Sequence, residues 1–369
     1  MESTGASAKE KAVLAALKLP RQSEEAVSSS LEELARLTVT AGDEVVEKVI
    51  EKRESIHPRT FIGPGQAETL GKLASSLGAE IIILNESLSP SQQRSLEEAT
   101  GKGIIDRTGL ILDIFARHAV SKDGALQVEL AQSEYRLPRL RGKGVELSRL
   151  GGGIGTKGPG EMKLEVDRRR IQARIRRLKK ELERIARTRE TQTKRRKKSG
   201  VFEVCLVGYT NAGKSTVMNR LTGSAVFVAD MLFATVDSTT RRLSAPGQDI
   251  VISDTVGFIR DLPHELIAAF RATLEGVCDA DLLLEIVDVA DTGWPGHLQS
   301  VEDVLKEIGA DFKPVVIVFN KTDKADPNEL ARVKRQYTDA VFVSGVTEAG
   351  LSELVEQLRK RAAGFSSGA

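Results

Sequence analysis

The sequence predicts an α/β protein: two α/β domains joined by a helical coiled-coil arm. Apolar runs of strand length alternate with helical patterns over residues 38–118 and again from residue 201 onward, which indicates βαβ units and mainly parallel sheets. Between them, a glycine-rich stretch precedes a long basic segment with apolar residues at heptad spacing. We place the boundaries as a polar extension (1–37), an N-terminal α/β domain (38–124), the arm with a basic hinge (125–199) and a C-terminal α/β domain (200–369).

Composition excludes several classes of protein. Hydrophobic residues make up 40% of the 369-residue chain and charged residues 29%, a balance typical of globular domains. The longest apolar runs, EIIILNE and VVIVFN, are far shorter than the roughly 20 residues that span a bilayer. The N-terminus lacks the apolar core of a secretory signal, and Cys205 and Cys278 stand in apolar surroundings typical of reduced thiols. We therefore expect a cytoplasmic monomer without a membrane span.

In the N-terminal domain the predicted strands and helices follow one another in order. Residues 1–40 are polar and show only short helical patterns, and ARLTVTAG (35–42) predicts the first strand. A helix, GQAETLGKLASSLG (65–78), and a buried strand, AEIIILN (79–85), come next. The following helix is expected to have Ser89 as its N-cap, Pro90 as its first residue and Gly101 at its end. GIIDR (103–107) then predicts a short strand, and GLILDIFARHA (109–119) an apolar helix.

The arm is predicted from residues 125–138, an amphipathic helix, and from a second, longer helix. Six glycines and a proline between residues 151 and 160 predict a loop that separates the two. In the second helix, apolar residues recur at heptad spacing and form a seam for the first helix, namely Leu164, Ile171, Ile175, Leu178, Leu182 and Ile185. The overall charge of +2 conceals the basic character of residues 168–198, and TKRRKKSG (193–200) is predicted to be a polar hinge.

The C-terminal domain is predicted from five near-continuous apolar runs, as expected of strands that are buried on both faces. These runs are VFEVCLVG (201–208), DIVISDT (249–255), DLLLEIVD (281–288), PVVIVFN (314–320) and AVFVSG (340–345). Helical patterns separate them, and GLSELVEQLRKRAAG (350–364) predicts a final helix.

The segment GYTNAGKS (208–215) follows the first of these strands and precedes a helix, so it matches the GxxxxGK[ST] phosphate-binding loop in its expected context. Backbone N–H groups of such a loop surround phosphates, Lys214 can reach the β- and γ-phosphates, and the Ser215 hydroxyl can bind Mg²⁺. A chance glycine-rich turn is the alternative, which the flanking strand and helix disfavour. The predicted phosphate-binding residues are Gly208, Tyr209, Thr210, Asn211, Ala212, Gly213, Lys214, Ser215 and Thr216.

The segment NKTD (320–323) predicts that the base is guanine. It follows an apolar strand, about 105 residues after the phosphate-binding loop. Asp323 can accept hydrogen bonds from the guanine N1–H and exocyclic amine, which adenine lacks, so the site favours GTP over ATP. Asn320 would join this segment to the phosphate-binding loop, and the Lys321 stem can lie over the base. The base pocket is predicted to be completed by Thr322 and by Ser344, Gly345 and Val346 of SGVT.

The segment DTVG (254–257) lies between these motifs and predicts sensors of the metal and the γ-phosphate. Asp254 can hold Mg²⁺ through water, the N–H of Gly257 can meet the γ-phosphate, and Thr255 and Val256 complete the segment. The preceding LFATVDSTTRR (232–242) offers Thr235, Thr239 and Thr240 as Mg²⁺ ligands, and spacing alone does not choose among them. The expected catalytic set is Lys214, Thr235 and Gly257, and the expected metal ligands are Ser215, Thr235 and Asp254.

These elements stand in the order typical of TRAFAC GTPases, so the C-terminal domain is expected to be a Ras-like P-loop G domain. Over roughly residues 38–362 the chain resembles the HflX family in particular. The resemblance is carried by LSPSQQRSLE, DRTGLILDIFA, LQVELAQSEYRLPRL, GGGIGTKGPGEMKLEVDRRRI and DTVGFIRDLPHELIAAFRATLE. It implies GTP hydrolysis, an N-terminal domain without a phosphate-binding loop, and binding to the large ribosomal subunit in ribosome splitting, rescue or assembly.

The resemblance also implies the switch threonine. The family element FATLD corresponds to Phe233, Ala234, Thr235, Val236 and Asp237, which makes Thr235 the expected Mg²⁺ ligand beside Ser215. The chain departs from the family pattern at Met162, Ser238 and Gly345, where threonine, proline and alanine are usual. None of these departures removes a proposed ligand.

Two residues raise questions about hydrolysis. Phe258 stands where some GTPases have a water-positioning glutamine, so the backbone, Mg²⁺ and a partner would have to order the attacking water. Turnover should then be slow alone and faster with ribosomes; alternatively, Phe258 is an apolar side chain packed beneath the switch. Asn211 either supports its loop or helps to recruit K⁺, as in some GTPases with asparagine there.

The basic arm predicts contact with ribosomal RNA phosphates, through some of Lys157, Arg168, Arg169, Arg170 and Arg174. A solvated charged helix face is the alternative. Two other functions remain open: a nucleotide-gated switch that binds RNA or protein away from ribosomes, and an RNA-modifying enzyme with an attached GTPase. Both cysteines lie in the G domain and the four histidines, at 57, 118, 264 and 297, show no ligand spacing, which disfavours the RNA-modifying enzyme.

Overall fold

The structure, a computed structural model, describes residues 9–140, 159–198, 200–223, 232–233, 239–243, 249–260 and 271–366. The chain divides into two compact units, residues 1–117 with 129–178 and residues 118–128 with 179–369. Each unit has its own parallel or mainly parallel sheet, so the predicted α/β fold with a G domain is confirmed.

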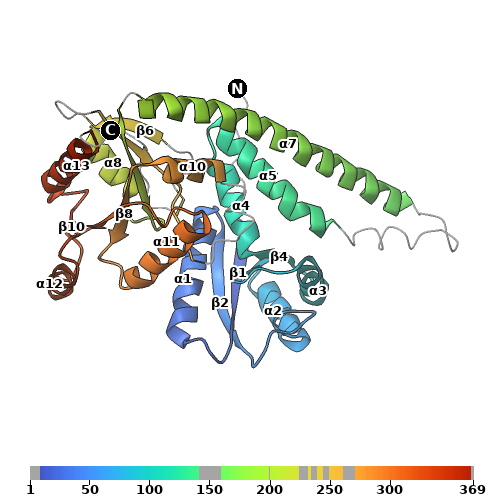
Figure 1. The fold of residues 1–369 in the computed structure, drawn as a ribbon. Helices are drawn as coiled ribbons and strands as arrows, with labels where there is room; N and C mark the ends of the chain where they lie inside the picture. The colour runs from blue at the N-terminus through green and yellow to red at the C-terminus, as the bar shows by residue number, and fades with distance from the viewer. Residues whose placement is uncertain are drawn as a thin grey trace, which may run out of the picture. The chain divides into compact units, whose positions relative to one another are not determined.

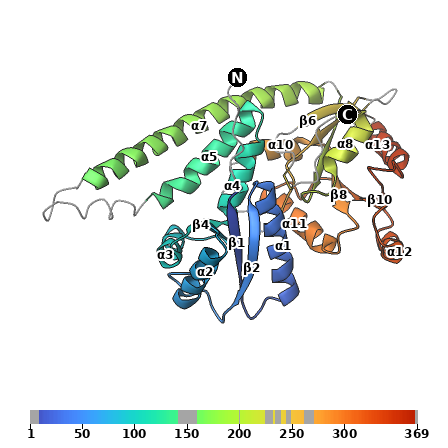
Figure 2. The ribbon, with the colours of Figure 1, turned by 180° about the vertical axis from the view of Figure 1, so that it is seen from behind.

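The first unit is built on a four-stranded parallel sheet in the order β2-β1-β3-β4. The central strand β1 is an alanine- and leucine-rich run that is buried on both faces. Figures 1 and 2 show α1 on one face and α2 and α3 on the other. The strands are β1 (Lys11–Lys18), β2 (Glu44–Lys52), β3 (Ile81–Leu84) and β4 (Gly103–Asp106), and the helices are α1 (Glu24–Thr40), α2 (Pro64–Ser76), α3 (Pro90–Thr100) and α4 (Arg107–His118).

The N-terminal boundary was predicted wrongly. Residues 11–40 are not a polar extension followed by a strand, because they form β1 and α1 of the sheet unit. Alanine and leucine favour helices in isolation, and only pairing between β2 and β3 makes this run a strand. The β-branched residues of 38–40 indicated a strand, but α1 continues through them. Thr38 and Thr40 donate their hydroxyl hydrogen bonds to carbonyls one turn earlier, and Leu34 and Leu37 are fully buried.

The start of α3 follows its local sequence signals. Ser89 is the N-cap, its hydroxyl accepts from the N–H of Gln92, and the Gln92 side chain accepts from the N–H of Ser89 in return. This reciprocal capping box satisfies two backbone donors that a helix terminus otherwise leaves open. Gly101 ends the helix with a left-handed φ of 66°, a conformation that costs glycine nothing.

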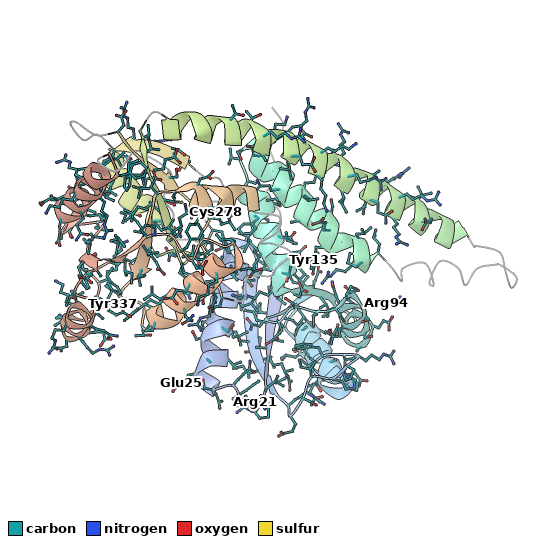
Figure 3. All side chains as sticks on the ribbon, viewed as in Figure 1. Arg21, Glu25, Arg94, Tyr135, Cys278 and Tyr337 are labelled. Atoms are coloured by element: carbon teal, nitrogen blue, oxygen red, sulfur yellow. The ribbon has the colours of Figure 1, made fainter. Side chains whose placement is uncertain are left out.

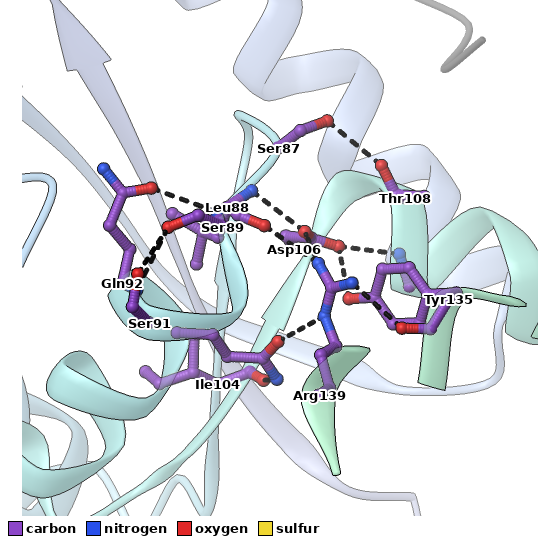
Figure 4. A network of polar contacts seen from close by, with 12 residues as sticks. Ser87, Leu88, Ser89, Ser91, Gln92, Ile104, Asp106, Thr108, Tyr135 and Arg139 are labelled. Atoms are coloured by element: carbon purple, nitrogen blue, oxygen red, sulfur yellow. Dashed lines mark hydrogen bonds and ion pairs between the residues drawn. The ribbon is translucent and has the colours of Figure 1, made fainter. Parts of the chain in front are cut away.

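A buried network at the carboxyl end of β4 fastens the arm to the sheet (Figure 4). The Asp106 carboxylate accepts from the backbone N–H groups of Leu88 and Gly109, from the Tyr135 hydroxyl at 2.7 Å and from Arg139 at 3.1 Å. The Arg139 guanidinium also lies 3.5 Å from the centre of the Tyr135 ring. These groups bind one another and the backbone of the same unit, so we interpret the network as structural.

The arm consists of two long helices, α5 (Lys122–Arg139) and α7 (Pro159–Lys198), which run side by side in both ribbon views (Figures 1 and 2). Arg174 pairs with Glu129, and Lys122 pairs with Glu181, so the helices are antiparallel. Of the predicted seam, Ile175 and Leu178 are buried, and the seam residues 171, 182 and 185 are half-buried. The predicted hinge at 193–200 is wrong for residues 193–198, which continue α7. Most of the glycine-rich loop, with Lys157, lies outside the described residues.

The second unit holds a six-stranded sheet in the order β10-β9-β8-β5-β7-β6, parallel except for β6. One core lies against α8 and α13 and the opposite core against α10 and α11. The strands are β5 (Phe202–Gly208), β6 (Thr239–Leu243), β7 (Ile250–Asp254), β8 (Leu282–Asp288), β9 (Val315–Asn320) and β10 (Val341–Phe342). The helices are α8 (Lys214–Thr222), α10 (Arg271–Asp279), α11 (Trp294–Glu307), α12 (Pro327–Gln336) and α13 (Leu351–Ser366).

Candidate functional site

The phosphate-binding motif forms the turn from β5 into α8, at the carboxyl edge of the sheet. Its two framing glycines are required by space and by backbone conformation. Gly208 has a φ of 145°, and a Cβ there would lie 2.3 Å from the carbonyl oxygen of Ile286. Gly213 has a φ of 92°, and a Cβ would lie 2.3 Å from the Nδ2 atom of Asn320. The loop can therefore pack this closely against β8 and β9 only with glycine.

Lys214 is buried at the start of α8, and its ammonium is held by the loop itself. The Nζ atom donates to the carbonyl oxygens of Gly208 at 3.0 Å and Tyr209 at 2.9 Å. Burial lowers the pKa of this ammonium to about 8, while the charge of Asp254 acts in the opposite direction. A buried ammonium whose partners are mainly neutral carbonyl oxygens binds a negatively charged phosphate strongly.

Ser215 and Asp254 meet at the base of the loop, with the Ser215 hydroxyl donating to the Asp254 carboxylate at 2.5 Å. Asp254 is fully buried at the end of β7, and burial raises the pKa of its carboxyl group. Its second oxygen, Oδ1, is buried without a hydrogen-bond partner within the described residues. An open carboxylate oxygen beside a hydroxyl is the donor set that Mg²⁺ takes in nucleotide sites, so these residues fit that ion.

Asn320 joins three loops at the carboxyl ends of the strands. Its side chain is buried and donates to the carbonyl oxygen of Ala212 at 2.9 Å, while its Oδ1 accepts from the N–H of Gly345 at 3.0 Å. A Cβ on Gly345 would lie 2.9 Å from a methyl carbon of Thr216, so the glycine at this position keeps the contact close. One amide thereby fixes the P-loop against the loops after β9 and β10.

Asp323 lies beside Ser344, whose hydroxyl donates to the Asp323 carboxylate at 2.6 Å. The Ser344 oxygen in turn accepts from the backbone N–H groups of Val346 and Thr347. Asp323 itself is exposed, while Ser344 is fully buried. The hydroxyl of Thr322 donates to the carbonyl of Val343, which closes the loop from the other side. The carboxylate is therefore oriented by its neighbours and open to a ligand.

Phe258 is a core residue. Its side chain is 1% exposed and packs with apolar residues of β5, β8, α10 and α11. Its backbone N–H donates to Gly208 at 3.1 Å, and its carbonyl accepts from the N–H of Thr210 at 2.7 Å. A Cβ on the adjacent Gly257 would lie 2.8 Å from the Cα of Thr210 and 3.1 Å from the Nζ of Lys214. The segment after Asp254 therefore lies directly on the P-loop, and the benzyl group points away from it into the core.

Other expected residues are either outside the described residues or lie at the edge of this site. Thr235, with residues 234 and 236–238, lies outside the described residues, while Phe233 is buried with a φ of 57°. The alternatives Thr239 and Thr240 begin the edge strand β6, in register with Asp254 and Ser253 of β7. Of the basic residues proposed to contact RNA, Arg174 makes a bidentate ion pair with Glu129 at 2.6 and 2.5 Å.

Comparison with known proteins identifies the family. Residues 28–116 match the family described as "GTP-binding GTPase N-terminal", residues 118–196 "GTP-binding GTPase Middle Region", and residues 203–321 "50S ribosome-binding GTPase". The GTPase HflX of Caldanaerobacter subterraneus subsp. tengcongensis is 46% identical over 353 residues, which cover 95% of this chain and 80% of that protein. The chain belongs to the HflX family of GTPases. It is a GTP-hydrolysing enzyme with a P-loop G domain that binds guanine nucleotides.

One further relative and one solved structure extend the comparison. The GTPase HflX of Escherichia coli (strain K12) is 43% identical over 337 residues, covering 90% of this chain and 79% of that protein. A solved structure, "crystal structure of SsGBP and GDP complex", is 25% identical with a TM-score of 0.52 and covers 97% of this chain and 99% of that one. The HflX resemblance inferred from motifs over residues 38–362 is thus confirmed.

Sequence reasoning missed two sets of contacts around the candidate nucleotide site of this HflX protein. The ring of Tyr209 stacks on His297 of α11 at 3.9 Å, and its hydroxyl accepts from the N–H of Arg260. Asp288, at the end of β8, forms an ion pair with Lys321. The position of Asp288 at the end of a buried strand could have indicated that it belongs to the site. Nothing in the local sequence indicates that residues 209 and 297 contact each other.

Proposed function

We propose that this HflX protein hydrolyses GTP in a cycle controlled by the large ribosomal subunit, and that it acts in the cytoplasm, as a monomer, in ribosome splitting, rescue or assembly. The observation that carries the proposal is the basic surface of α7, in a chain whose G domain matches a family described as 50S ribosome-binding. In the part of the chain that the structure describes, no helix has the length and apolar character needed to cross a membrane.

In this proposal the P-loop residues 208–216 hold the phosphates through their backbone N–H groups, and Lys214 neutralises the β- and γ-phosphates. Ser215 and Asp254, with Thr235, would hold Mg²⁺, which supplies charge neutralisation between the β- and γ-phosphates. A Cβ on Gly257 would lie 3.1 Å from the Nζ of Lys214, and this closeness to the P-loop lysine supports a role for the Gly257 N–H at the γ-phosphate. The orphaned oxygen of Asp254 supports the metal assignment.

The base is recognised in this proposal by the carboxyl-end loops of β9 and β10. Asp323 accepts from the guanine N1–H and amine, and Ser344 fixes the carboxylate at 2.6 Å. The other residues that we propose to contact the base are Asn320, Lys321, Thr322, Gly345 and Val346. Those that we propose to lie near the phosphates are Phe233, Ala234, Val236, Asp237, Thr255 and Val256. Because adenine lacks the donor pair, ATP should bind far more weakly.

With Phe258 in the core, no side chain at that position orients water, which supports slow hydrolysis in the free protein. A ribosome that orders the switch segments would then raise turnover. The left-handed backbone of Asn211, with a φ of 62°, supports its role in shaping the loop. We also propose that a K⁺ ion can bind beside Asn211. Equal GTP turnover in K⁺ and in Na⁺ at constant ionic strength would contradict this K⁺ site.

The ribosome-binding surface that we propose is the exposed face of α7. Its described exposed basic residues are Arg169, Arg170, Arg176, Arg177, Lys179, Lys180, Arg184 and Arg187, against a single exposed acidic residue, Glu183, between positions 168 and 188. Figure 3 shows such side chains projecting from α7 on the side away from α5. Helical side chains on one face can contact successive RNA phosphates without reading bases. Arg174, paired with Glu129, fits the arm's own packing better than RNA contact.

Co-sedimentation with purified large subunits tests this proposal. The chain with a non-hydrolysable GTP analogue should pellet with the subunits more strongly than with GDP, and added salt should weaken binding steeply. Replacing Arg176 and Arg177 by glutamate should reduce binding at least about tenfold. The matched control replaces the exposed pair Lys334 and Arg335 of α12 by glutamate and should leave binding unchanged.

Turnover of GTP measured with and without large subunits completes the test. Stimulation by the subunits supports the proposed cycle, and fast turnover that ignores them contradicts it. Nucleotide-dependent binding to other RNA or protein, with none to ribosomes, would favour the alternative of a guanine-nucleotide-gated switch that acts elsewhere.

A further inference from the structure

The carboxyl end of β8 places an acidic side chain beside the predicted base site. Asp288 ends β8 in register with Asn320 of β9, and the N–H of Val289 donates to the carbonyl of Asn320 at 3.1 Å. One carboxylate oxygen of Asp288 accepts from the N–H of Ala290 at 3.1 Å. The strand end and this short turn hold the carboxylate in one orientation.

The second carboxylate oxygen of Asp288 binds the ammonium of Lys321 at 2.6 Å. The two side chains are 19% and 22% exposed, so this ion pair is shielded from water more than a surface pair is. Lys321 has a left-handed φ of 60°, which turns its side chain away from the strand direction. Its Cε atom lies 4.0 Å from the position of a Cβ on Gly213, so the lysine stem extends along the P-loop.

A free lysine side chain has four rotatable carbon–carbon bonds and loses about 2 kcal/mol of rotamer entropy when it is ordered. Where a protein fixes such a chain before the ligand arrives, the ligand does not bear that cost. Asp288 fixes the end of the chain, and the turn at Lys321 fixes its beginning. The apolar stem is therefore held in one orientation beside the P-loop.

We propose that Asp288 is a positioning residue for guanine-nucleotide binding, acting through the ammonium of Lys321 to hold the lysine stem where the base packs. This inference rests on the proposed location of the base site. It assigns Asp288 a part in affinity but not in base identity, because the stem offers only van der Waals contact. The carboxylate of Asp323 reads the base edge independently of this ion pair.

Binding of a fluorescent GDP derivative to the full chain tests the proposal. Asp288→Asn keeps the size of the side chain and weakens the ion pair, so the affinity for GDP should fall about 5- to 10-fold. The Michaelis constant for GTP should rise to match, with the turnover number at saturation unchanged. The ratio of affinities for GDP and inosine diphosphate should stay constant. Asp291→Asn is the matched control, since the Asp291 carboxylate accepts from the N–H of Gly293 in the same loop.

A double-mutant cycle separates positioning from a purely structural role. In a Lys321→Met background, which keeps an apolar stem without the charge, Asp288→Asn should change GDP affinity less than about twofold. If Asp288→Asn lowers the unfolding midpoint without nucleotide but leaves GDP affinity intact, or if its effect persists fully beside Lys321→Met, the positioning role is overturned. Failure of the unaltered chain to bind any guanine nucleotide would instead overturn the proposed site.

Discussion

Phe258 provides the sharpest test of how the switch region is built. Replacing it by glutamine restores the amide that some GTPases use to orient water, and a reading of the sequence motif alone predicts faster hydrolysis. The structure predicts the reverse. The ring is 1% exposed and lies among core residues of β5, β8, α10 and α11, so an amide in its place enters the core and not the nucleotide site.

The size of the effect follows from the buried ring. A phenylalanine buries about 150–250 Å² of side chain, worth about 4–6 kcal/mol at about 25 cal/mol per Å². Glutamine also brings a polar group into an apolar site, which adds about 1–3 kcal/mol if the amide has no partner. Domains are stable by only about 5–15 kcal/mol, so Phe258→Gln should unfold the G domain or nearly so. Phe258→Leu keeps most of the apolar contact and should cost about 1–2 kcal/mol.

Urea unfolding, GDP affinity and GTP turnover of both variants form the assay. Because the backbone of Phe258 is hydrogen-bonded to Gly208 and Thr210, its substitution should lower GDP affinity along with stability. Leu274→Ala is the control, since Leu274 belongs to the same core cluster, and it should lower stability with a smaller effect on GDP affinity. A folded Phe258→Gln protein that loses less than about 1 kcal/mol and hydrolyses GTP at least about tenfold faster would refute this reasoning.

Three further predictions follow from buried contacts of the G domain. Gly208→Ala should abolish nucleotide binding and cost at least about 2 kcal/mol, because its Cβ would overlap the carbonyl of Ile286; calorimetry with and without GDP measures both. Asn320→Ala leaves two buried backbone groups unpaired and should weaken GDP at least about tenfold in a fluorescence titration. Burial, with a smaller effect from the charge of Glu302, raises the pKa of Glu285 from 4.5 to about 8. Between these two pH values the folded state binds a proton at Glu285 that the unfolded state has lost, so the free energy of unfolding should fall as pH rises from about 4.5 to about 8. The total loss of stability over this range is at most about 5 kcal/mol, at about 1.4 kcal/mol per pKa unit. Glu285→Gln should flatten the pH dependence, and an unchanged dependence in urea unfolding would contradict the assignment.

Local signals sufficed for much of the fold. The N-cap Ser89, the first residue Pro90 and the closing Gly101 of α3 depend on local sequence alone, and all three stand where the sequence predicted them. The buried strands of the G domain were predictable because each is a continuous apolar run bounded by polar residues. The P-loop and its neighbours also stand at strand ends, and the carboxyl ends of parallel strands meet at one edge of a sheet.

Other features depended on contacts between distant segments. The run KAVLAALK is a strand because β2 and β3 pair with it on either side. Residues 38–40 are helical in a helix that packs against β1 and β2 and fully buries Leu34 and Leu37. The spacing of basic residues along α7 did not predict that Arg174 pairs with Glu129, because Glu129 lies on the other arm helix.

By itself, the sequence determined that this chain has a guanine-nucleotide motif set in HflX order, since each motif is a short string whose chemistry resides in its own residues. Only the tertiary structure decided what lies behind the motifs. It turned Phe258 into the core, joined three loops through Asn320, and set Asp288 against Lys321. The physical reason is that burial and pairing belong to residues that are distant in the chain, and no local pattern specifies which of them will meet.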